Sequence, residues 1–237
     1  MTSHGSAPYR WVKGSCTVWS QLTAPDSEAF DWFDPLTASL GAQPVTAGGR
    51  GSAWYVTVQG VRGVLRLYRR GGWLASFNKS LYLWLGDRHA RSFNEYRVLS
   101  ELSKEGLPVP NPIGAMVCRV GGVFYRAGLI TERIDAVTTL AGSDIQSVWR
   151  TAGQTIARMH NLGVWHADLN VHNVLVQAPQ IVWLIDFDKA QTGVRSQQKL
   201  DLNLARLLRS IRKVCPQHED RLWPVLQQGY RELRLIT

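Results

Sequence analysis

Long apolar runs are missing from this sequence. No window reaches the roughly 20 apolar residues that a membrane-spanning helix needs. The first thirty residues also lack the uninterrupted apolar stretch of a signal peptide. We therefore expect neither secretion nor integral insertion into a membrane.

Cysteine is scarce, because the 237 residues contain three: Cys16, Cys118 and Cys215. Their number is odd, they lie far apart, and no two have the C-x-x-C spacing of a zinc knuckle. We expect neither a disulfide framework nor a zinc site. This pattern fits a reducing cytosol.

Acidic residues are few compared with basic ones. The sequence contains 18 Asp and Glu residues and 27 Lys and Arg residues, which gives a net charge of +9. Such a charge favours a polyanionic partner, such as nucleic acid, phosphorylated lipid or nucleotide, without choosing among them. The ten tryptophans suit an anionic membrane surface as well as a packed core, which is their commoner use.

The first half of the chain contains the patterns of strands. Residues 53–58 and 64–68 predict a β-hairpin, and the Gly121-Gly122 pair predicts the turn of a second one. Between them, apolar residues at three-residue spacing over 93–102 predict a helix. We expect this half to be mainly antiparallel sheet with one helix.

The second half is richer in helical patterns. An apolar stripe over 145–159 predicts a long helix, with Ser143 and Gln146 as its capping box. Short strands follow at 174–176 and 181–185, and the apolar face over 204–214 predicts a final helix. Strands first and helices second indicate an α+β chain with two lobes.

The strongest motif runs from His166 to Asn173 and has the H-x-D-L-x-x-x-N form of a phosphotransferase catalytic loop. Thirteen residues after Asn173, Asp186 begins a D-F-x sequence typical of a metal-binding turn. Phosphoryl transfer needs oxygen ligands for magnesium, for which Asp186 and Asn173 are the candidates. It also needs a carboxylate beside the attacking hydroxyl, for which Asp168 is the candidate. The alternative is an acidic turn between two core strands.

Two residues near this motif are more ambiguous. His166 either packs behind the loop, hydrogen-bonded to backbone, or ligates a metal with His172, and the structural role is favoured because no further ligands stand at a typical spacing. Asp188 either assists the metal or caps a turn, and we favour the turn.

Upstream, Gly49 and Gly51 form a glycine-rich turn whose backbone amides could approach phosphates. Arg66 lies on the strand where kinases usually carry the lysine that holds the α and β phosphates, and Glu95 is its expected helix partner. An exposed arginine on an edge strand is the alternative for Arg66. Lys79 competes with it for the contact to ATP.

The stretch 66–91 is basic and aromatic, which suits an anionic acceptor at a membrane interface. The alternative is a solvated insert with a few core aromatics. A second group of basic residues lies over 206–213, where a solvated polar face is the favoured interpretation. This group consists of Arg206, Arg209, Arg212 and Lys213.

Six segments together strongly resemble one family, the 3-deoxy-D-manno-octulosonic acid (Kdo) kinases, over roughly residues 45–215. They are Val64–Trp73, Asn94–Tyr96, Gly106–Pro110, Leu129–Glu132, His166–Asn170 and Ile185–Asp188. The R-G-G and D-F-D elements are typical of this family rather than of kinases in general.

The resemblance implies a bilobal protein-kinase-like fold of the α+β class, with an antiparallel-sheet lobe at 1–132 and a compact, mainly helical lobe at 133–237. It implies transfer of phosphate from ATP, with Mg²⁺, to the 4-hydroxyl of the Kdo residue of Kdo-lipid A during assembly of the lipopolysaccharide core. The resemblance also implies that the protein is bound peripherally to the cytoplasmic side of the cell inner membrane and that it has no nucleic-acid partner. Asp168 matches the catalytic residue, Asn173 and Asp186 match the metal ligands, and Glu132 lies in the hinge expected to face adenine.

The chain departs from protein kinases at several points. The glycine turn has no third glycine, Asn170 replaces the usual loop lysine, and D-F-D replaces D-F-G. The 51 residues after Asp186 contain no A-P-E element, which disfavours a peptide acceptor. Two other functions stay open: a kinase for another small hydroxyl acceptor, such as an aminoglycoside, and a catalytically silent nucleotide-binding or nucleic-acid-binding module.

Overall fold

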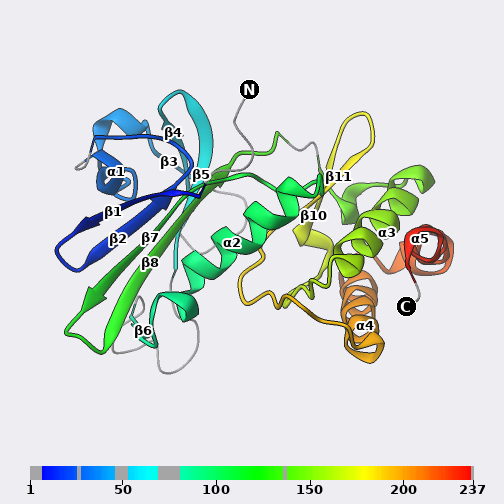
Figure 1. Cartoon of the computed structure of the whole chain (residues 1–237). Coiled ribbons are helices and arrows are strands. Elements are labelled where there is room, and N and C mark those ends of the chain that lie inside the picture. The colour runs from blue at the N-terminus through cyan, green and yellow to red at the C-terminus, as the bar shows by residue number, and fades with distance from the viewer. Residues whose placement is uncertain (1–6, 26–27, 46–52, 69–80, 136–137, 236–237) are drawn as a thin grey trace. The chain divides into compact units, whose positions relative to one another are not determined.

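The computed structural model describes residues 7–25, 28–45, 53–68, 81–135 and 138–235 (Figure 1). These residues form two compact units. Unit 1 comprises residues 1–97 and 111–133, and unit 2 comprises 98–110 and 134–237. Residues 98–110 group with unit 2 although they lie inside the expected first lobe, and the lobe boundary at 132 stays a prediction.

Unit 1 is built on an antiparallel sheet in the order β1-β2-β7-β8-β5-β4-β3, with β6 also paired to β8. The two predicted hairpins are confirmed as β4–β5 and β7–β8. Gly121 and Gly122 both have positive φ angles, 60° and 74°, as a tight two-residue turn requires. The strands are β1 (Tyr9–Lys13), β2 (Cys16–Ser20), β3 (Gln43–Pro44), β4 (Ala53–Val58), β5 (Val61–Leu67), β6 (Tyr82–Leu83), β7 (Pro112–Val120) and β8 (Phe124–Glu132).

The predicted helix is α2 (Arg91–Lys104). All four residues of its apolar stripe, at positions 93, 96, 99 and 102, are buried. At its first turn the ring of Phe93 stacks on Trp19 of β2, with centroids 4.0 Å apart. Unit 1 also contains the short helix α1 (Glu28–Asp31) and two 3-10 turns, η1 (Ala38–Leu40) and η3 (Asp87–His89).

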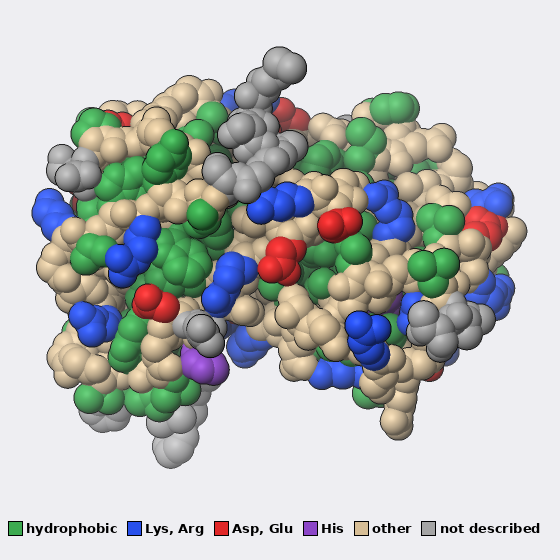
Figure 2. Space-filling model, viewed as in Figure 1, with side chains coloured by type: hydrophobic (Ala, Val, Ile, Leu, Met, Phe, Trp, Pro, Cys, Tyr) green, Lys and Arg blue, Asp and Glu red, His purple; other side chains and the backbone are tan. Residues whose placement is uncertain are grey.

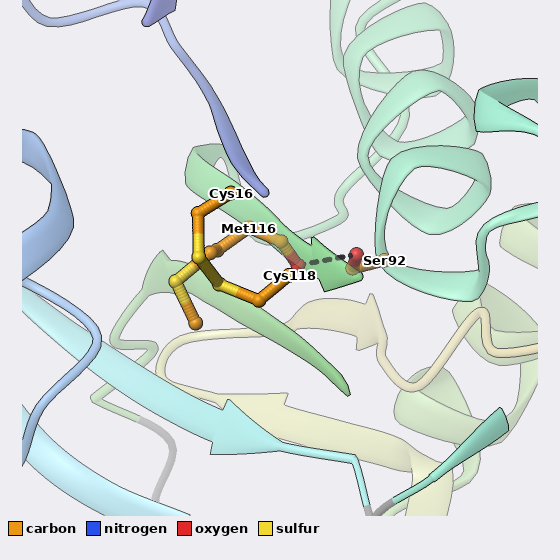
Figure 3. Close-up of a disulfide and its surroundings, with 4 residues drawn as sticks. All are labelled: Cys16, Ser92, Met116 and Cys118. Atoms are coloured by element: carbon orange, nitrogen blue, oxygen red, sulfur yellow. Dashed lines mark hydrogen bonds between the residues drawn. A yellow bond between two sulfur atoms is a disulfide. The ribbon is translucent and has the colours of Figure 1, made fainter. Parts of the chain in front are cut away.

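The prediction that the cysteines form no disulfide is wrong. Cys16 of β2 is bonded to Cys118 of β7 (Figure 3). These residues are 102 positions apart in the chain but are direct partners in the β2–β7 ladder, with Cα atoms 4.0 Å apart. Nearby, the hydroxyl of Ser92 in α2 donates to the backbone oxygen of Met116, two residues before Cys118 on β7. Because disulfides are rare in a reducing cytosol, cysteine usage no longer supports that compartment.

Unit 2 combines a three-stranded sheet, in the order β11-β10-β9, with the helices α3, α4 and α5 and with residues 98–104 of α2. A helix not expected from the sequence, α5, follows α4, so the prediction that 204–214 ends the helical part is wrong. The strands are β9 (Thr138–Thr139), β10 (Val174–Gln177) and β11 (Ile181–Leu184), the helices α3 (Gln146–Asn161), α4 (Gln197–Val214) and α5 (Glu219–Leu233), and the 3-10 turns η4 (Leu140–Gly142), η5 (Val171–Asn173) and η6 (Pro216–His218).

The capping box predicted for α3 is also wrong. The N-cap residue is Ile145, which makes no side-chain capping bond. Ser143 instead follows the preceding 3-10 turn η4 as its C-cap. Its backbone oxygen accepts a 2.8 Å hydrogen bond from the indole N–H of the buried Trp149. The helix therefore begins two residues later than the capping box requires, and Ser143 contacts it through its backbone oxygen.

Helices α3 and α5 approach each other at two glycines. A Cβ atom on Gly153 would lie 2.0 Å from the backbone oxygen of Leu226, and one on Gly229 would lie 2.1 Å from that of Arg150. No side chain fits at either position, so the two helices are packed backbone to backbone. This packing brings α5 close enough for Tyr230 to reach into the core of the unit.

Among the residues with described positions, no helix has both the length and the apolar character to cross a membrane.

Candidate active site

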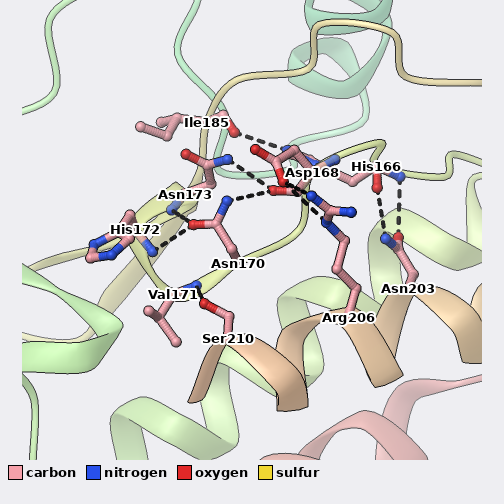
Figure 4. Close-up of polar contacts among 10 residues, drawn as sticks. All are labelled: His166, Asp168, Asn170, Val171, His172, Asn173, Ile185, Asn203, Arg206 and Ser210. Atoms are coloured by element: carbon pink, nitrogen blue, oxygen red, sulfur yellow. Dashed lines mark hydrogen bonds and ion pairs between the residues drawn. The ribbon is translucent and has the colours of Figure 1, made fainter. Parts of the chain in front are cut away.

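The catalytic-loop motif lies between α3 and β10 in unit 2 (Figure 4). Asn170 determines its shape. The Oδ1 atom of Asn170 accepts hydrogen bonds from the backbone N–H groups of His172 (2.9 Å) and Asn173 (3.2 Å), while its Nδ2 donates to the backbone oxygen of Asp168 (2.9 Å). The amide therefore caps η5 and folds the loop back on itself. Protein kinases carry a lysine at this position. Here the side chain is neutral, and its hydrogen bonds are made to backbone groups of the loop.

His166 has the structural role that the sequence favoured. Its Nδ1 accepts from the backbone N–H of Asp168 (3.1 Å), so the ring proton lies on Nε2, which donates to the backbone oxygen of Ile185 (2.9 Å). Burial lowers the pKa of His166, and the ring packs against Phe187 with centroids 4.8 Å apart. The neutral imidazole thus joins the catalytic loop to the turn that contains Asp186.

A buried polar network holds His166 from behind. Asn203 of α4 accepts from the backbone N–H of His166 (3.1 Å) and donates to its backbone oxygen (2.6 Å). The Oδ1 of Asn203 also accepts from Nε2 of His160 (3.2 Å), whose Nδ1 accepts from the hydroxyl of Tyr230 (2.9 Å). Burial lowers the pKa of His160 to about 4, so this ring is neutral near pH 7. Three helices together fix the loop backbone.

The carboxylate of Asp168 lies in front of this framework and is paired with Arg206 of α4. Nε of Arg206 is 3.0 Å from Oδ1 of Asp168, and Nη2 contacts the same oxygen. Both side chains are about half exposed, at 46% for Arg206 and 48% for Asp168. The interpretation of Arg206 as part of a solvated face missed this contact. The contact follows from the position of Arg206 three residues after Asn203, on the face of α4 that packs against the loop.

Asn173 and Asp186, the proposed metal ligands, come from adjacent segments. The backbone N–H of Ile185 donates to the backbone oxygen of Asn173 (3.1 Å), which places the residue before Asp186 against the loop. Nδ2 of Asn173 donates to the backbone oxygen of Asp168 (2.9 Å), which leaves the amide oxygen as the atom able to bind a cation. Asp186 has a left-handed backbone, with φ of 66°, a conformation that is enriched at functional sites.

A carboxylate and an amide oxygen are ligands of the hard type that Mg²⁺ takes, and two protein ligands suffice when phosphate oxygens and water complete the shell. These residues therefore fit the metal. No group of three or more His, Cys, Asp or Glu that could hold a metal occurs within the described ranges.

In unit 1, Arg66 and Glu95 form an ion pair. Nη2 of Arg66 lies 2.5 Å from both carboxylate oxygens of Glu95, whose side chain is 2% exposed. The hydroxyl of Tyr68 also donates to Glu95, and burial, together with the negative charge of Glu95, raises the pKa of Tyr68. Arg66 is on β5, which lies between β4 and β8, so the alternative of an edge strand is wrong.

Of the other residues predicted to contact ATP, the structure describes Glu132. Glu132 ends β8, and its Oε2 accepts from Nδ2 of Asn111 (2.8 Å). Gly49, Gly51 and Lys79 lie outside the described residues. Their contacts to ATP stay predictions, as do those of Arg66 and Glu132.

Comparison with known proteins points to one family of kinases. The model of the lipopolysaccharide kinase (Kdo/WaaP) family matches residues 39–230. A 3-deoxy-D-manno-octulosonic acid kinase of Xylella fastidiosa (strain M12) is 44% identical over 186 residues, covering 77% of this chain and 74% of that protein. Another, from Xanthomonas euvesicatoria pv. vesicatoria (strain 85-10), is 41% identical over 212 residues, covering 88% and 85%.

A solved structure, described as WaaP in complex with acyl carrier protein, has the same fold. It superposes with a TM-score of 0.56 at 16% sequence identity, covering 89% of this chain and 88% of that one. This likeness confirms the kinase-like fold of the α+β class, while the family match and the relatives establish the kind of enzyme. The chain belongs to the lipopolysaccharide kinase (Kdo/WaaP) family.

Proposed function

We propose that this chain is a Kdo kinase that transfers the γ-phosphoryl group of ATP to the 4-hydroxyl of the Kdo residue of Kdo-lipid A. The observation that supports this most is the half-exposed carboxylate of Asp168, on a loop whose backbone is fixed by His166, Asn170 and Asn203. The relatives named as Kdo kinases, at 40–44% identity, support the choice of acceptor.

In this proposal, Asp168 orients the acceptor hydroxyl and accepts its proton as the oxygen attacks phosphorus. The fixed loop backbone keeps the carboxylate in place, which reduces the ordering that the reaction needs. Asn173 and Asp186 would hold Mg²⁺, which when bound neutralises charge on the phosphates. His166 stays neutral and holds the catalytic loop against the turn that contains Asp186.

Arg66 supplies the cation for the α and β phosphates of ATP, in the role that lysine has in protein kinases. Glu95 holds the guanidinium through both carboxylate oxygens, which limits its rotamers. Gly49 and Gly51 would offer backbone amides to the phosphates, and Glu132 would face adenine from the hinge.

The acceptor assay tests this function directly. Purified protein is incubated with ATP, Mg²⁺ and Kdo-lipid A, and the lipid is analysed by mass spectrometry for one added phosphate on Kdo. An aminoglycoside is offered in a parallel reaction. Phosphorylated Kdo-lipid A is the expected product. Phosphorylation of the aminoglycoside with none on Kdo-lipid A would contradict the proposed acceptor, and the absence of ATP binding would contradict the enzyme.

We also propose that the protein acts peripherally at the anionic cytoplasmic face of the inner membrane. Unit 1 carries Lys and Arg side chains among exposed hydrophobic ones on the face seen in Figure 2. A hollow of about 500 Å³ on this unit contains three basic residues, Arg10, His89 and Arg119, and one acidic residue, Asp87.

Several large apolar side chains near this hollow are exposed to solvent. Val12 and Leu85 line the hollow itself and are 56% and 65% exposed. Leu83 and Phe124, which are paired in the β6–β8 ladder, are 51% and 40% exposed. Cationic and apolar side chains on one surface suit an anionic lipid interface, since charge attracts the headgroups while apolar groups enter the boundary.

Vesicle sedimentation tests this surface. The protein is expected to sediment with vesicles of phosphatidylglycerol and phosphatidylcholine more than with phosphatidylcholine alone. Arg10→Glu with Arg119→Glu should reduce this binding at least tenfold. The matched control, Lys213→Glu with Arg231→Glu, makes the same charge change at exposed positions of unit 2. An equal loss in both variants would show that net charge, rather than this surface, determines binding.

A further inference from the structure

The proposed acceptor presents the catalytic loop with an electrostatic problem. A Kdo sugar carries a carboxylate on the same ring system as the hydroxyl to be phosphorylated. When that hydroxyl reaches Asp168, a second negative charge comes close to the catalytic carboxylate and to the phosphates of ATP. Like charges at such distances repel, and the repulsion grows as water is displaced. A cation beside Asp168 would compensate.

The loop itself does not supply this cation at the usual position. Asn170 stands where protein kinases carry lysine, and its amide is neutral. Both ends of the amide are already used, because Oδ1 accepts from two backbone N–H groups and Nδ2 donates to the oxygen of Asp168. The side chain is therefore a structural part of the loop rather than a receptor for an anion.

Arg206 supplies a cation at this point from another element. In Figure 4 its side chain extends from α4 to the carboxylate of Asp168. Its Nε and Nη2 atoms both contact Oδ1 of Asp168. Three residues earlier, Asn203 anchors the same face of α4 to the backbone of His166, so the helix position of Arg206 is fixed relative to the loop.

The guanidinium also has unused binding capacity. It has five N–H donors in a planar fork, and two nitrogens serve the single oxygen Oδ1. The pair is about half exposed on both sides, and ion pairs of this kind contribute little to stability. Reorienting the fork toward a second anion therefore costs little. A carboxylate is a good partner because its two oxygens match the spacing of guanidinium donors.

We propose that Arg206 binds the carboxylate of the acceptor sugar while it remains against Asp168, and that this contact makes the enzyme selective for acidic sugars. The inference rests on the proposed function and assigns a specificity role within it. Arg206 thereby shields the catalytic carboxylate from the charge of its own substrate.

Kinetics with two acceptors test this role. Wild type, Arg206→Gln, Arg206→Lys and the control Lys213→Gln are compared on Kdo-lipid A and on its carboxyl methyl ester. Lys213 is an exposed cation two turns further along the same helix. The ester should raise KM of wild type for the acceptor by about tenfold to a hundredfold, the range of a lost charge-assisted contact. Arg206→Gln should raise KM for Kdo-lipid A by a similar factor, with KM for ATP within about twofold.

The decisive result comes from combining the substitution Arg206→Gln with the methyl ester of the acceptor. On the ester, Arg206→Gln should cost no more than about a further twofold, because the contact is already missing. Arg206→Lys, which keeps the charge without the fork, should be intermediate, and Lys213→Gln should match wild type.

An equal loss for Arg206→Gln on both acceptors would overturn the inference and leave Arg206 as a positioning residue for Asp168. A fall in kcat with unchanged KM on Kdo-lipid A would overturn it too. If wild type phosphorylates neither acceptor, the proposed function itself fails, and the inference fails with it.

Discussion

Two ion pairs between arginine and a carboxylate, one in each unit, differ mainly in burial. In unit 1, Glu95 is 2% exposed and Arg66 is 28% exposed, and Tyr68 adds a hydrogen bond to the same carboxylate. In unit 2, Asp168 and Arg206 are 48% and 46% exposed. Chemically similar pairs therefore stand in very different surroundings.

Burial determines what each pair can do. A buried carboxylate that loses its cation stays uncompensated in a medium of low dielectric constant, so the pair at Glu95 is kept together. An exposed pair is compensated by water and exchanges partners at little cost. We therefore interpret the first pair as a fixed part of the architecture and the second as one that can rearrange around a substrate.

The largest effect on stability is expected from the Cys16–Cys118 disulfide, which adds a covalent link to the fixed architecture of unit 1. It closes a loop of 102 residues, and loops of that size lose much chain entropy on cross-linking. Reduction with dithiothreitol should lower the free energy of unfolding by about 4 kcal/mol, measured by urea denaturation. The variant Cys16→Ser with Cys118→Ser should behave like the reduced protein and should not respond to dithiothreitol. A wild-type protein that is equally stable with and without reductant would contradict this prediction.

Removing the buried carboxylate is expected to have the next largest effect. Glu95→Ala leaves Arg66 without its acceptor and the hydroxyl of Tyr68 without its partner, and should cost about 3 kcal/mol of unfolding free energy. Glu95→Gln keeps an acceptor for Tyr68 and should cost clearly less. If both variants unfold at the wild-type urea concentration, Glu95 is not part of a fixed architecture.

Protonation should destabilise the network behind the catalytic loop. The pKa of His160 is about 4 in the folded protein, against about 6.5 when unfolded. Between these values the unfolded state binds more protons, so stability is full above pH 6.5 and falls as the pH drops toward 4. The loss should be about 2.5 kcal/mol over that interval. In urea denaturation at several pH values, His160→Gln should make the free energy of unfolding less dependent on pH. His172→Gln, at an exposed position of the loop, should leave the pH dependence unchanged.

The smallest effect on stability is expected at the exposed pair. Arg206→Gln should lower the free energy of unfolding by less than about 1 kcal/mol, because both side chains are solvated in its absence. The measurement is the same urea denaturation used for Glu95→Ala. A loss as large as that of Glu95→Ala would remove the contrast between the two pairs.

Much of the fold could be predicted because its signals are local. The hairpins β4–β5 and β7–β8 and the buried face of α2 follow from strand patterns, turn glycines and helical spacing. The spacing within the catalytic loop indicated Asp168, and the structure adds the backbone contacts that hold it.

What could not be predicted depends on which distant segments meet. The disulfide requires that β2 pair with β7 in one register, which places Cys16 opposite Cys118, and sequence separation carries no information on that register. Arg206 is charged and lies on a helix, so its pattern is that of a solvated face. Only the packing of α4 against the loop reveals its contact with Asp168. The capping box at Ser143 failed for a local reason instead, because α3 has Ile145 as its N-cap and Trp149 of that helix binds the backbone oxygen of Ser143.

Phosphate transfer by Asp168→Asn, measured together with its unfolding, tests the central claim most directly. Asparagine keeps the shape of the side chain but cannot accept the proton of the acceptor hydroxyl. We expect transfer to Kdo-lipid A to fall by about a thousandfold, while the free energy of unfolding stays within about 1 kcal/mol of wild type. Transfer within tenfold of wild type by a folded variant would contradict the assignment of Asp168 as the catalytic residue.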